Sequence, residues 1–200
     1  MMKRERTRKG SRVIRLFSEV VFLCAIFVAA GMVIPRTAIA ETAAEIDRDV
    51  DSAIIKLYNA HHVAKELSKV AKGILVFPDV VKAGFIVGAQ YGTGALREEG
   101  KTVGYYNTVA ASYGLQAGAQ KFGYALIFMN QSALDYLKKS KGWEIGVGPS
   151  IVVVDEGLAR SLSTTTAKDD VYAFFFSQKG LMAGLGLQGS KISKIKPDKE

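Results

Sequence analysis

From Gly73 onward, apolar residues recur with a period of two, and no other feature of the sequence constrains the fold as strongly, because this spacing is typical of β-strands. Turn signals at Pro78-Asp79, at residues 98–101 and at residues 177–180 separate some of these strands, and a short helix is predicted over 131–139. Strands that follow one another with few helices between them indicate an antiparallel sheet, curled into a barrel or stacked as a sandwich. The predicted strands cover residues 74–77, 81–97, 103–120, 124–130, 143–154, 170–178 and 180–195.

The segment ahead of the sheet has helical spacing instead. Its apolar residues, from Ile46 to Ala71, follow one another in alternating steps of four and three, which places them on one face of a helix. Asn59 and the two histidines after it are expected to divide the segment into two helices, because Asn is a good N-cap. Its acidic start favours packing on its own domain, since helices at a membrane interface usually have a basic polar face. The sequence therefore predicts an α+β fold, with N-terminal helices followed by a glycine-rich antiparallel sheet.

Residues 1–40 have the organisation of a secretory signal peptide. A basic stretch precedes the apolar run at 20–34, and an Ala38-Ile39-Ala40 site follows it. The run is shorter than the ~20 residues that a membrane span needs, so an uncleaved anchor is the less favoured alternative. We expect export to the periplasm or another envelope location, with cleavage after Ala40 and residues 41–200 as the mature domain.

The predicted signal peptide accounts for most of the positive charge. The chain has 27 Lys and Arg against 19 Asp and Glu, and residues 1–40 hold 8 and 2 of these, which leaves 19 and 17 in the mature domain. The resulting net charge of +2 does not indicate nucleic-acid binding, which needs a basic patch on the folded domain. Cys24 is the only cysteine and lies in the leader, so neither disulfides nor thiol chemistry are expected in the mature domain.

Gly184, Gly186 and Gly189 have the G-x-G-x-x-G spacing of dinucleotide-binding loops. That motif requires a strand before it and a helix after it, within a βαβ unit of ~30 residues. Only 11 residues follow Gly189, and they include Pro197, so we predict that no nucleotide binds. The glycines are interpreted as leaving room for large rings on neighbouring strands or allowing the sheet to bend. Similar small-residue spacing recurs at glycines 84, 88, 92, 94, 114, 118, 142, 146 and 148.

Four blocks of sequence carry a family resemblance: AKGILVFPDVVKAGFIVGAQYGTGAL, GYYNTVAASYGLQAGAQ, KGWEIGVGPSIVVVDEG and VYAFFFSQKGLMAGLGLQGSKI. Together, in this order, they resemble the SYLF domain in its bacterial secreted form, over roughly residues 45–196. The resemblance implies a lipid-binding domain, since eukaryotic relatives bind phosphoinositide membranes and yeast members bind actin filaments. Actin is absent from a bacterial envelope, so for this chain the resemblance implies lipid or membrane binding in general, without a defined ligand site.

The sequence offers no constellation for catalysis. His61 and His62 are adjacent and diverge by ~100° on a helix, whereas metal-binding pairs need i,i+4 spacing, so a helix junction is preferred over a metal site. Asp155-Glu156 is followed by Gly157 and is interpreted as a turn. No serine lies in a G-x-S-x-G motif, and no nucleophile–base pair can be assembled. We therefore predict no enzyme activity, no catalytic residue, no cofactor and no metal.

Basic residues provide the candidate site, for the headgroups of anionic lipids. Lys191, Lys194 and Lys196 lie close together near the end of the chain, and Lys72 and Lys82 flank the first strands. Each cation near an anionic surface contributes about 1 kcal/mol. A solvated tail is the simpler interpretation of the last three lysines, because acidic residues follow them.

These observations lead to a hypothesis and an alternative. The leading hypothesis is a non-enzymatic lipid- or phospholipid-binding module of the bacterial cell envelope, whose partner is an anionic phospholipid or membrane surface. The alternative is a small outer-membrane β-barrel or a structural envelope protein, which fits secretion and the alternation of glycine with aromatic residues. The helical start and the predicted helix at 131–139 argue against that alternative.

Overall fold

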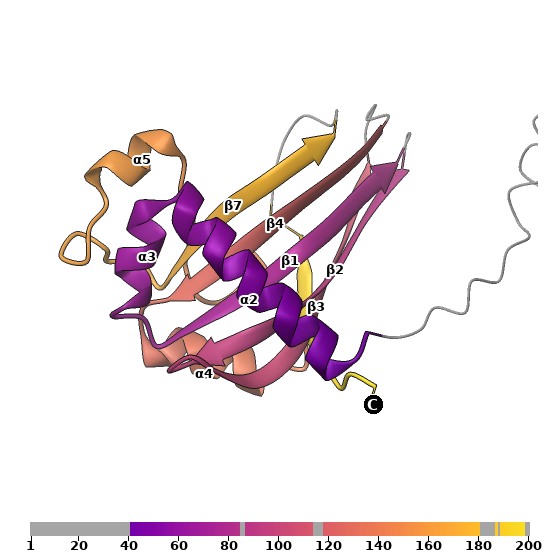
Figure 1. The fold of residues 1–200 in the computed structure, drawn as a ribbon, viewed down its shortest axis with the longest axis horizontal. Coiled ribbons are helices and arrows are strands. Elements are labelled where there is room, and N and C mark those ends of the chain that lie inside the picture. The colour runs from indigo at the N-terminus through magenta and orange to yellow at the C-terminus, as the bar shows by residue number, and fades with distance from the viewer. Residues whose placement is uncertain (1–40, 85–86, 114–117, 181–186, 188, 199–200) are drawn as a thin grey trace, which may run out of the picture. The chain divides into compact units, whose positions relative to one another are not determined.

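The computed structural model describes residues 41–198, except 85–86, 114–117, 181–186 and 188 (Figure 1). Helices come first, and a single eight-stranded sheet follows in the order β5-β8-β3-β2-β1-β4-β7-β6. The predicted α+β fold with a curled, barrel-like sheet is confirmed. The helices are α2 (Ala43–Ala60), α3 (His62–Ser68), α4 (Gln131–Lys139) and α5 (Glu156–Ser161); the strands are β1 (Gly73–Gly84), β2 (Val87–Glu98), β3 (Lys101–Tyr113), β4 (Gly118–Phe128), β5 (Trp143–Glu144), β6 (Ile151–Val153), β7 (Val171–Gly180) and β8 (Lys191–Ile195).

The sheet is antiparallel apart from one pair. Strands β6 and β7 run parallel, so the sheet is mixed rather than wholly antiparallel as predicted. The strands β5 and β6 occupy the two opposite edges of the sheet although only residues 145–150 separate them in sequence. Six residues span at most ~20 Å, so this short connection requires the sheet to curl until its edges approach each other.

Helix α2 begins at a capping box. The Thr42 hydroxyl accepts a hydrogen bond from the Glu45 amide, and the Glu45 carboxylate accepts one from the Thr42 amide at 2.9 Å. The Glu45 carboxylate accepts a further hydrogen bond from the Thr42 hydroxyl at 3.0 Å, and the bonds from the Thr42 amide first and from this hydroxyl second hold the pKa of Glu45 below its usual value. Along the helix, Ile46, Val50, Ala53 and Leu57 form a buried stripe, so the amphipathic segment packs on its own domain as predicted.

The two N-terminal helices meet at His61. This residue ends α2 and is the N-cap of α3, so the predicted helix junction is confirmed, although the cap is His61 rather than Asn59. Its Nε2 lies 2.8 Å from the Phe175 carbonyl oxygen, and its ring packs at 5.5 Å from that of Phe174. The histidine therefore anchors the junction to strand β7.

Both faces of the sheet bury hydrophobic side chains. The face that carries α2 and α3, here called the α2 face, packs Val76, Ile127 and Phe174 among others against these helices. The reverse side, here called the α4 face, packs a second cluster that includes Leu126 and Trp143 against α4. The protein core thus consists of two layers of side chains with the sheet between them.

Several predicted turns are strands in the structure. Pro78-Asp79 is a β-bulge inside β1, because the register with both neighbours shifts there while the strand continues to Gly84. The predicted strand 81–97 is two strands in the structure. Its first residues belong to β1 and its later ones to β2, and these two strands pair with each other, starting at Gly84 and Gly88. Residues 177–180 belong to β7, where Ser177 has a positive φ of 54°. In contrast, the predicted turn at 98–101 is confirmed, with Glu99 and Gly100 both at positive φ.

Close backbone packing explains two of the sheet glycines. A methyl group on Gly94 would overlap the Val76 carbonyl oxygen and lie 2.8 Å from the Phe77 ring, and one on Gly123 would overlap the Phe176 ring. These contacts support the interpretation that glycines make room for rings. In the GLGLQG stretch, Gly184 and Gly186 lie outside the described residues, while Leu187 is buried and Gly189 is in a turn with φ 74°.

Asp170 connects three parts of the fold just before β7. Its carboxylate accepts hydrogen bonds from Asn130 Nδ2 at 2.6 Å, from the Ser150 amide at 2.8 Å and from Ser150 Oγ at 3.0 Å. These hydrogen bonds, that of the Ser150 amide first, lower the pKa of Asp170. Nearby, Asp155 is the N-cap of α5 rather than part of the predicted turn, because its side chain accepts from the Leu158 amide at 2.8 Å.

Candidate membrane-binding surface

The structure does not bring the five predicted lysines together. Lys191 and Lys194 are both exposed on β8 but lie on opposite faces of the sheet, since Lys191 pairs with Val109 and Lys194 with Tyr106. Lys196 follows β8 and is exposed. Lys72 immediately precedes β1, whereas Lys82 lies near the other end of that strand and is half-buried on the α4 face. Lys191 is the member of the set that joins a larger arrangement.

That arrangement is a row of side chains that crosses the α2 face of the sheet. Directly paired residues share a face of a sheet, so the register of five strands defines the row without reference to side-chain conformation. We call it the Val81 row, and its members are, in spatial order, Lys179 on β7, Lys121 on β4, Val81 on β1, Tyr91 on β2, Val109 on β3 and Lys191 on β8.

All six side chains of the Val81 row are exposed. Val81, Tyr91 and Val109 in its middle have 49%, 55% and 45% of their surface accessible. Lysines flank them on both sides. Lys121 forms an ion pair with Asp79 at 3.0 Å, and both partners are more than half exposed, so the pair is weak. Glu144 continues the row past Lys191. The row is thus apolar in the centre and cationic toward both ends.

A second exposed row lies two residues further along each strand. We call it the alanine row, since it consists of Ala119, Ala83, Ala89 and Ala111. Val87, two residues beyond Ala89 on the same face of β2, is 56% exposed. Among the described residues, the α2 face is therefore exposed from the Val81 row onward, with apolar side chains in its middle.

The α4 face of the same strand segments is polar. Here Gln120, Lys82, Gln90 and Ala110 form one row, which we call the glutamine row. Gln90 and Gln120 are only 4% and 6% exposed. Within the described part of the chain, Gln90 Nε2 and Gln120 Oε1 are buried without a hydrogen-bond partner. The usual arrangement of soluble sheets, with apolar residues buried and polar ones exposed, is reversed at this end of the sheet.

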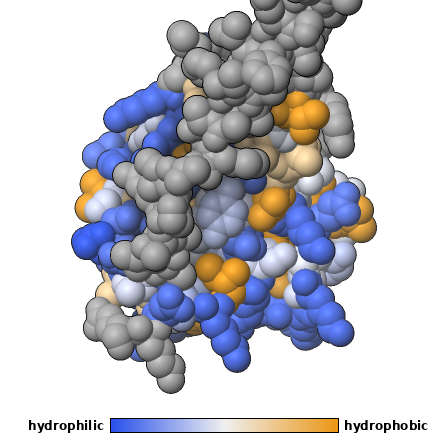
Figure 2. Space-filling view, turned by 90° about the vertical axis from the view of Figure 1, so that its right-hand side faces the viewer, coloured by the Kyte–Doolittle hydropathy of each residue, from blue (hydrophilic) through white to orange (hydrophobic). Residues whose placement is uncertain are grey.

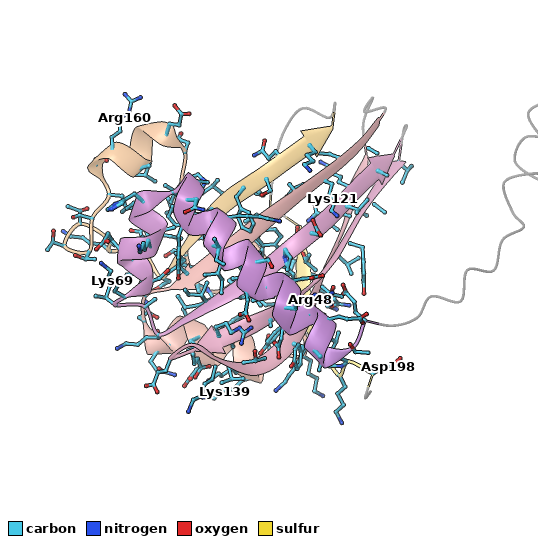
Figure 3. The ribbon with its side chains drawn as sticks, viewed as in Figure 1. Arg48, Lys69, Lys121, Lys139, Arg160 and Asp198 are labelled. Atoms are coloured by element: carbon cyan, nitrogen blue, oxygen red, sulfur yellow. The ribbon has the colours of Figure 1, made fainter. Side chains whose placement is uncertain are left out.

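The position of α2 explains where the exposed surface begins. The first residues of α2 lie against the bulge of β1 and Thr93, which belong to the row that directly precedes the Val81 row. Strands β1, β2, β4 and β7 continue past the helix toward the upper right of Figure 1. Lys121 lies on this continuation in Figure 3. Seen from the side toward which these strands run, hydrophobic residues reach the surface at several places between hydrophilic ones (Figure 2).

A separate hollow lies away from the Val81 row. A cavity of about 570 Å³ is formed by the connection between β5 and β6, by residues of β6, and by Leu187. Its apolar lining includes Ile145, Ile151 and Val153, and it lies where the two edges of the sheet approach each other. Among the described residues, no charged side chain lines it.

The described residues show neither a helix suited to crossing a membrane nor a metal-binding group. No helix in this part of the chain is long and apolar enough to span a bilayer. No three His, Cys, Asp or Glu side chains within it are arranged to hold a metal ion.

Sequence reasoning did not identify Lys121, Lys179, Val81, Tyr91 and Val109 as parts of one surface. Each residue is unremarkable in its own segment, and only the strand register brings them together. The order of the strands is not sequential, so neighbouring rows join residues that are distant along the chain. Val81 and Val109 could have been recognised as exposed residues from the sequence only if the point at which α2 stops covering the sheet had been known.

The comparison with protein families supports the resemblance noted in the sequence. Residues 109–198 match the model of the Ysc84 family, which is described as "Las17-binding protein actin regulator". No curated protein matches the chain. The matched segment extends from Val109 in β3 through β8, and so includes all three lysines of the Val81 row. Residues 109–198 are thus similar to the Ysc84 family, whose domain is also known as SYLF.

Proposed function

We propose that this protein is a non-enzymatic module that binds anionic phospholipid membranes through the Val81 row. The observation that carries the proposal is the row itself, in which three exposed apolar side chains lie between Lys179 and Lys121 on one side and Lys191 on the other. Lysines attract anionic headgroups, and tyrosine is favoured at the boundary between water and lipid. The family resemblance supports a lipid as the ligand.

The size of the electrostatic contribution follows from the number of lysines. Three cations near an anionic surface contribute ~3 kcal/mol at most. The ion pair of Lys121 with Asp79 and the proximity of Glu144 to Lys191 reduce this value. We therefore expect weak binding that depends on salt, since the Debye length shrinks from ~10 Å at 0.1 M to ~3 Å at 1 M ionic strength.

Co-sedimentation with vesicles tests the proposal. Residues 41–200 include every described helix and strand, so the protein that begins at Glu41 is suitable. We expect it to bind phosphatidylglycerol-containing vesicles more strongly than pure phosphatidylcholine vesicles, and the triple variant Lys121→Ala/Lys179→Ala/Lys191→Ala to lose most of this preference. A matched control is Lys56→Ala/Lys65→Ala/Lys101→Ala, which removes the same charge at exposed positions outside the row.

Two further outcomes have clear meanings. If Lys191→Ala/Lys194→Ala/Lys196→Ala lowers binding more than the row variant does, the lysines near the C-terminus act together and the row is not the site. If the protein binds no vesicle of any composition, the lipid proposal is wrong. A protein partner then becomes the better explanation, as the description of the family names one for other members.

We also propose that the chain is exported and cleaved after Ala40. The basic stretch, the apolar run at 20–34 and the Ala38-Ile39-Ala40 site support this proposal. The intact mass of the protein isolated from the cell envelope tests it. A mass that begins at Glu41 is expected, whereas a mass that still includes the leader would support an uncleaved anchor.

A further inference from the structure

At one end of the sheet, the two faces have exchanged their polarity. Val81 on the α2 face is about half exposed, while Gln90 and Gln120 of the glutamine row on the α4 face are nearly inaccessible. The alanine row and Val87 extend the exposed apolar surface toward the strand ends. Exposed apolar surfaces of this kind mark sites of protein or membrane interaction. The reversal is local, because both faces are covered and apolar at the other end of the same strands.

We propose that this uncovered end of the α2 face enters the bilayer, so that the alanine row and Val87 reach the acyl chains while the lysines of the Val81 row remain at the headgroups. This inference rests on the proposed function and adds the mode and orientation of binding to it. Lysine suits the boundary position, since its apolar stem lies along the hydrocarbon while its ammonium group stays in water.

Backbone hydrogen bonding limits the depth of penetration. The alanine row lies roughly 7 Å beyond the Val81 row, since each residue of a strand advances about 3.3 Å. Among the described residues, β8 pairs with β3 only as far as Val109, so no described strand pairs with this edge of β3 from Ala110 onward. Unpaired backbone groups are not tolerated in the hydrocarbon core. The geometry therefore fits a shallow position at the boundary between headgroups and acyl chains, within the ~5–10 Å reached by interfacial elements.

The charges of the row favour lipid over a second copy of the chain as the covering partner. In a two-fold symmetric pairing the same surface meets itself. The Lys179 and Lys121 end of one row would then meet the Lys191 end of the other, and like charges that face each other oppose association. Anionic headgroups neutralise both ends of the row at once.

Tryptophan reporters test the depth directly. The variants Tyr91→Trp and Val109→Trp place an indole on the Val81 row, and Ile55→Trp places one on an exposed position of α2 as the matched control. Trp143 is 1% exposed and gives a constant background. Each variant of residues 41–200 is mixed with phosphatidylglycerol vesicles that contain brominated phosphatidylcholine, which quenches only indoles that reach the acyl chains. We expect blue-shifted emission and strong quenching at positions 91 and 109, and neither at position 55.

The outcomes separate this inference from the proposed function. If the proteins co-sediment with the vesicles and the reporters on the row are not quenched, binding is electrostatic adsorption, so the inference is wrong and the proposed function stands. If no variant co-sediments, both are wrong. If emission of the row reporters shifts with protein concentration in the absence of lipid, and light scattering shows dimers, a second copy covers the surface and the inference is overturned.

A polar variant provides the complementary test. Val81→Ser/Tyr91→Ser/Val109→Ser retains all lysines but removes the apolar centre, and we expect roughly tenfold weaker vesicle binding in high salt, where only apolar contacts remain. Thermal unfolding checks that the variant folds, which we expect because these side chains are exposed. Unchanged binding in high salt would contradict insertion.

Discussion

The two ends of the same four central strands show how the cover of a sheet, rather than its sequence pattern, determines what its residues do. At the covered end, Leu75 and Val76 on β1 are successive residues on opposite faces, and both are completely buried. At the uncovered end, Val80 is buried while Val81, next to it, is about half exposed. Valine occupies positions 76, 80 and 81, so residue type does not distinguish the two ends. The difference arises because α2 ends its cover one row before Val81.

The comparison also indicates which end serves stability and which serves binding. Buried side chains at the covered end contribute most of the hydrophobic stabilisation. Those of the Val81 row contribute little to folding in water because they remain exposed in the folded state. Variants at Phe174, Gly123, Asp170 and Thr42 test this division between a stabilising end and a binding end.

The largest contrast is expected between two aromatic residues in strands. Phe174 is fully buried between β7 and the helices, so Phe174→Ala should lower the free energy of unfolding by about 3–5 kcal/mol. Tyr91 is 55% exposed, so Tyr91→Ala should change it by no more than about 0.5 kcal/mol. Urea unfolding of both variants measures the difference. Similar losses in the two variants would show that the uncovered end also supports the fold.

The next effect tests close packing beside the bulge in β1. A methyl group at position 123 would overlap the Phe176 ring and lie 2.8 Å from the Pro78 carbonyl oxygen, so Gly123→Ala should cost about 1–3 kcal/mol. Gly104→Ala is the control, because its methyl group would overlap no atom and would approach only side chains, the Tyr106 ring at 3.2 Å and Lys194 at 3.5 Å. Thermal unfolding compares the two. Equal midpoints would contradict the role assigned to Gly123 at the border between the two ends.

A smaller loss of stability is expected when the carboxylate of Asp170, which binds Asn130 and Ser150, is replaced. Asp170→Asn should lower stability by about 1 kcal/mol, because the amide cannot reproduce all the hydrogen bonds from Asn130 and Ser150. The pKa of Asp170 is lowered in the folded state. Its contribution is therefore fully present above the unfolded pKa of ~3.9 and is lost as the pH falls through the folded value.

Unfolding measured as a function of pH checks the sign of this effect. The difference in stability between parent and Asp170→Asn should be constant near neutral pH and should shrink in acid below the pKa of an unfolded aspartate. A difference that grows in acid would show that another group is responsible.

The smallest effect concerns the start of α2, where the cover of the sheet begins. Thr42→Ala removes the capping hydroxyl and should cost about 1 kcal/mol or less. We expect hydrogen exchange to accelerate at the amides of the first turn of α2 and to remain unchanged in α3. Ser52→Ala, within the exposed face of α2, is the control. If hydrogen exchange accelerates along the whole of α2, the cap stabilises the entire helix and not only its first turn.

Local signals in the sequence predicted α2, α3, α4 and one turn, but not α5, the bulge or the assembly of the sheet. The apolar stripe of α2, the division near the histidines and α4 follow from spacing within short segments. Pro78-Asp79 has the composition of a turn, yet pairing with β2 and β4 on both sides carries the strand through it as a bulge. The parallel partner of β7 also depends on distant residues.

The candidate surface was predictable only in its chemistry. Lysines and a lipid partner follow from the sequence and its resemblance, and Lys191 is common to the predicted set and the Val81 row. Lys121 and Lys179 face each other because β4 and β7 are neighbours, although α4, β5, β6 and α5 lie between them in sequence. A one-residue slip in either register would place these lysines on the other face.

The position of β8 has a consequence for the order in which the chain folds. This strand lies between β5 and β3, so Ile192 pairs with Thr108 on one side and with Trp143 on the other. The edge strand β5 has its sheet partner in β8, and β3 exposes an unsatisfied edge until residues 191–195 have been synthesised. A nascent chain of this kind cannot close its sheet in the order in which it emerges from the ribosome, and such long-range pairing slows folding. We therefore expect a delay between synthesis and closure, during which a chaperone has access to the open edge.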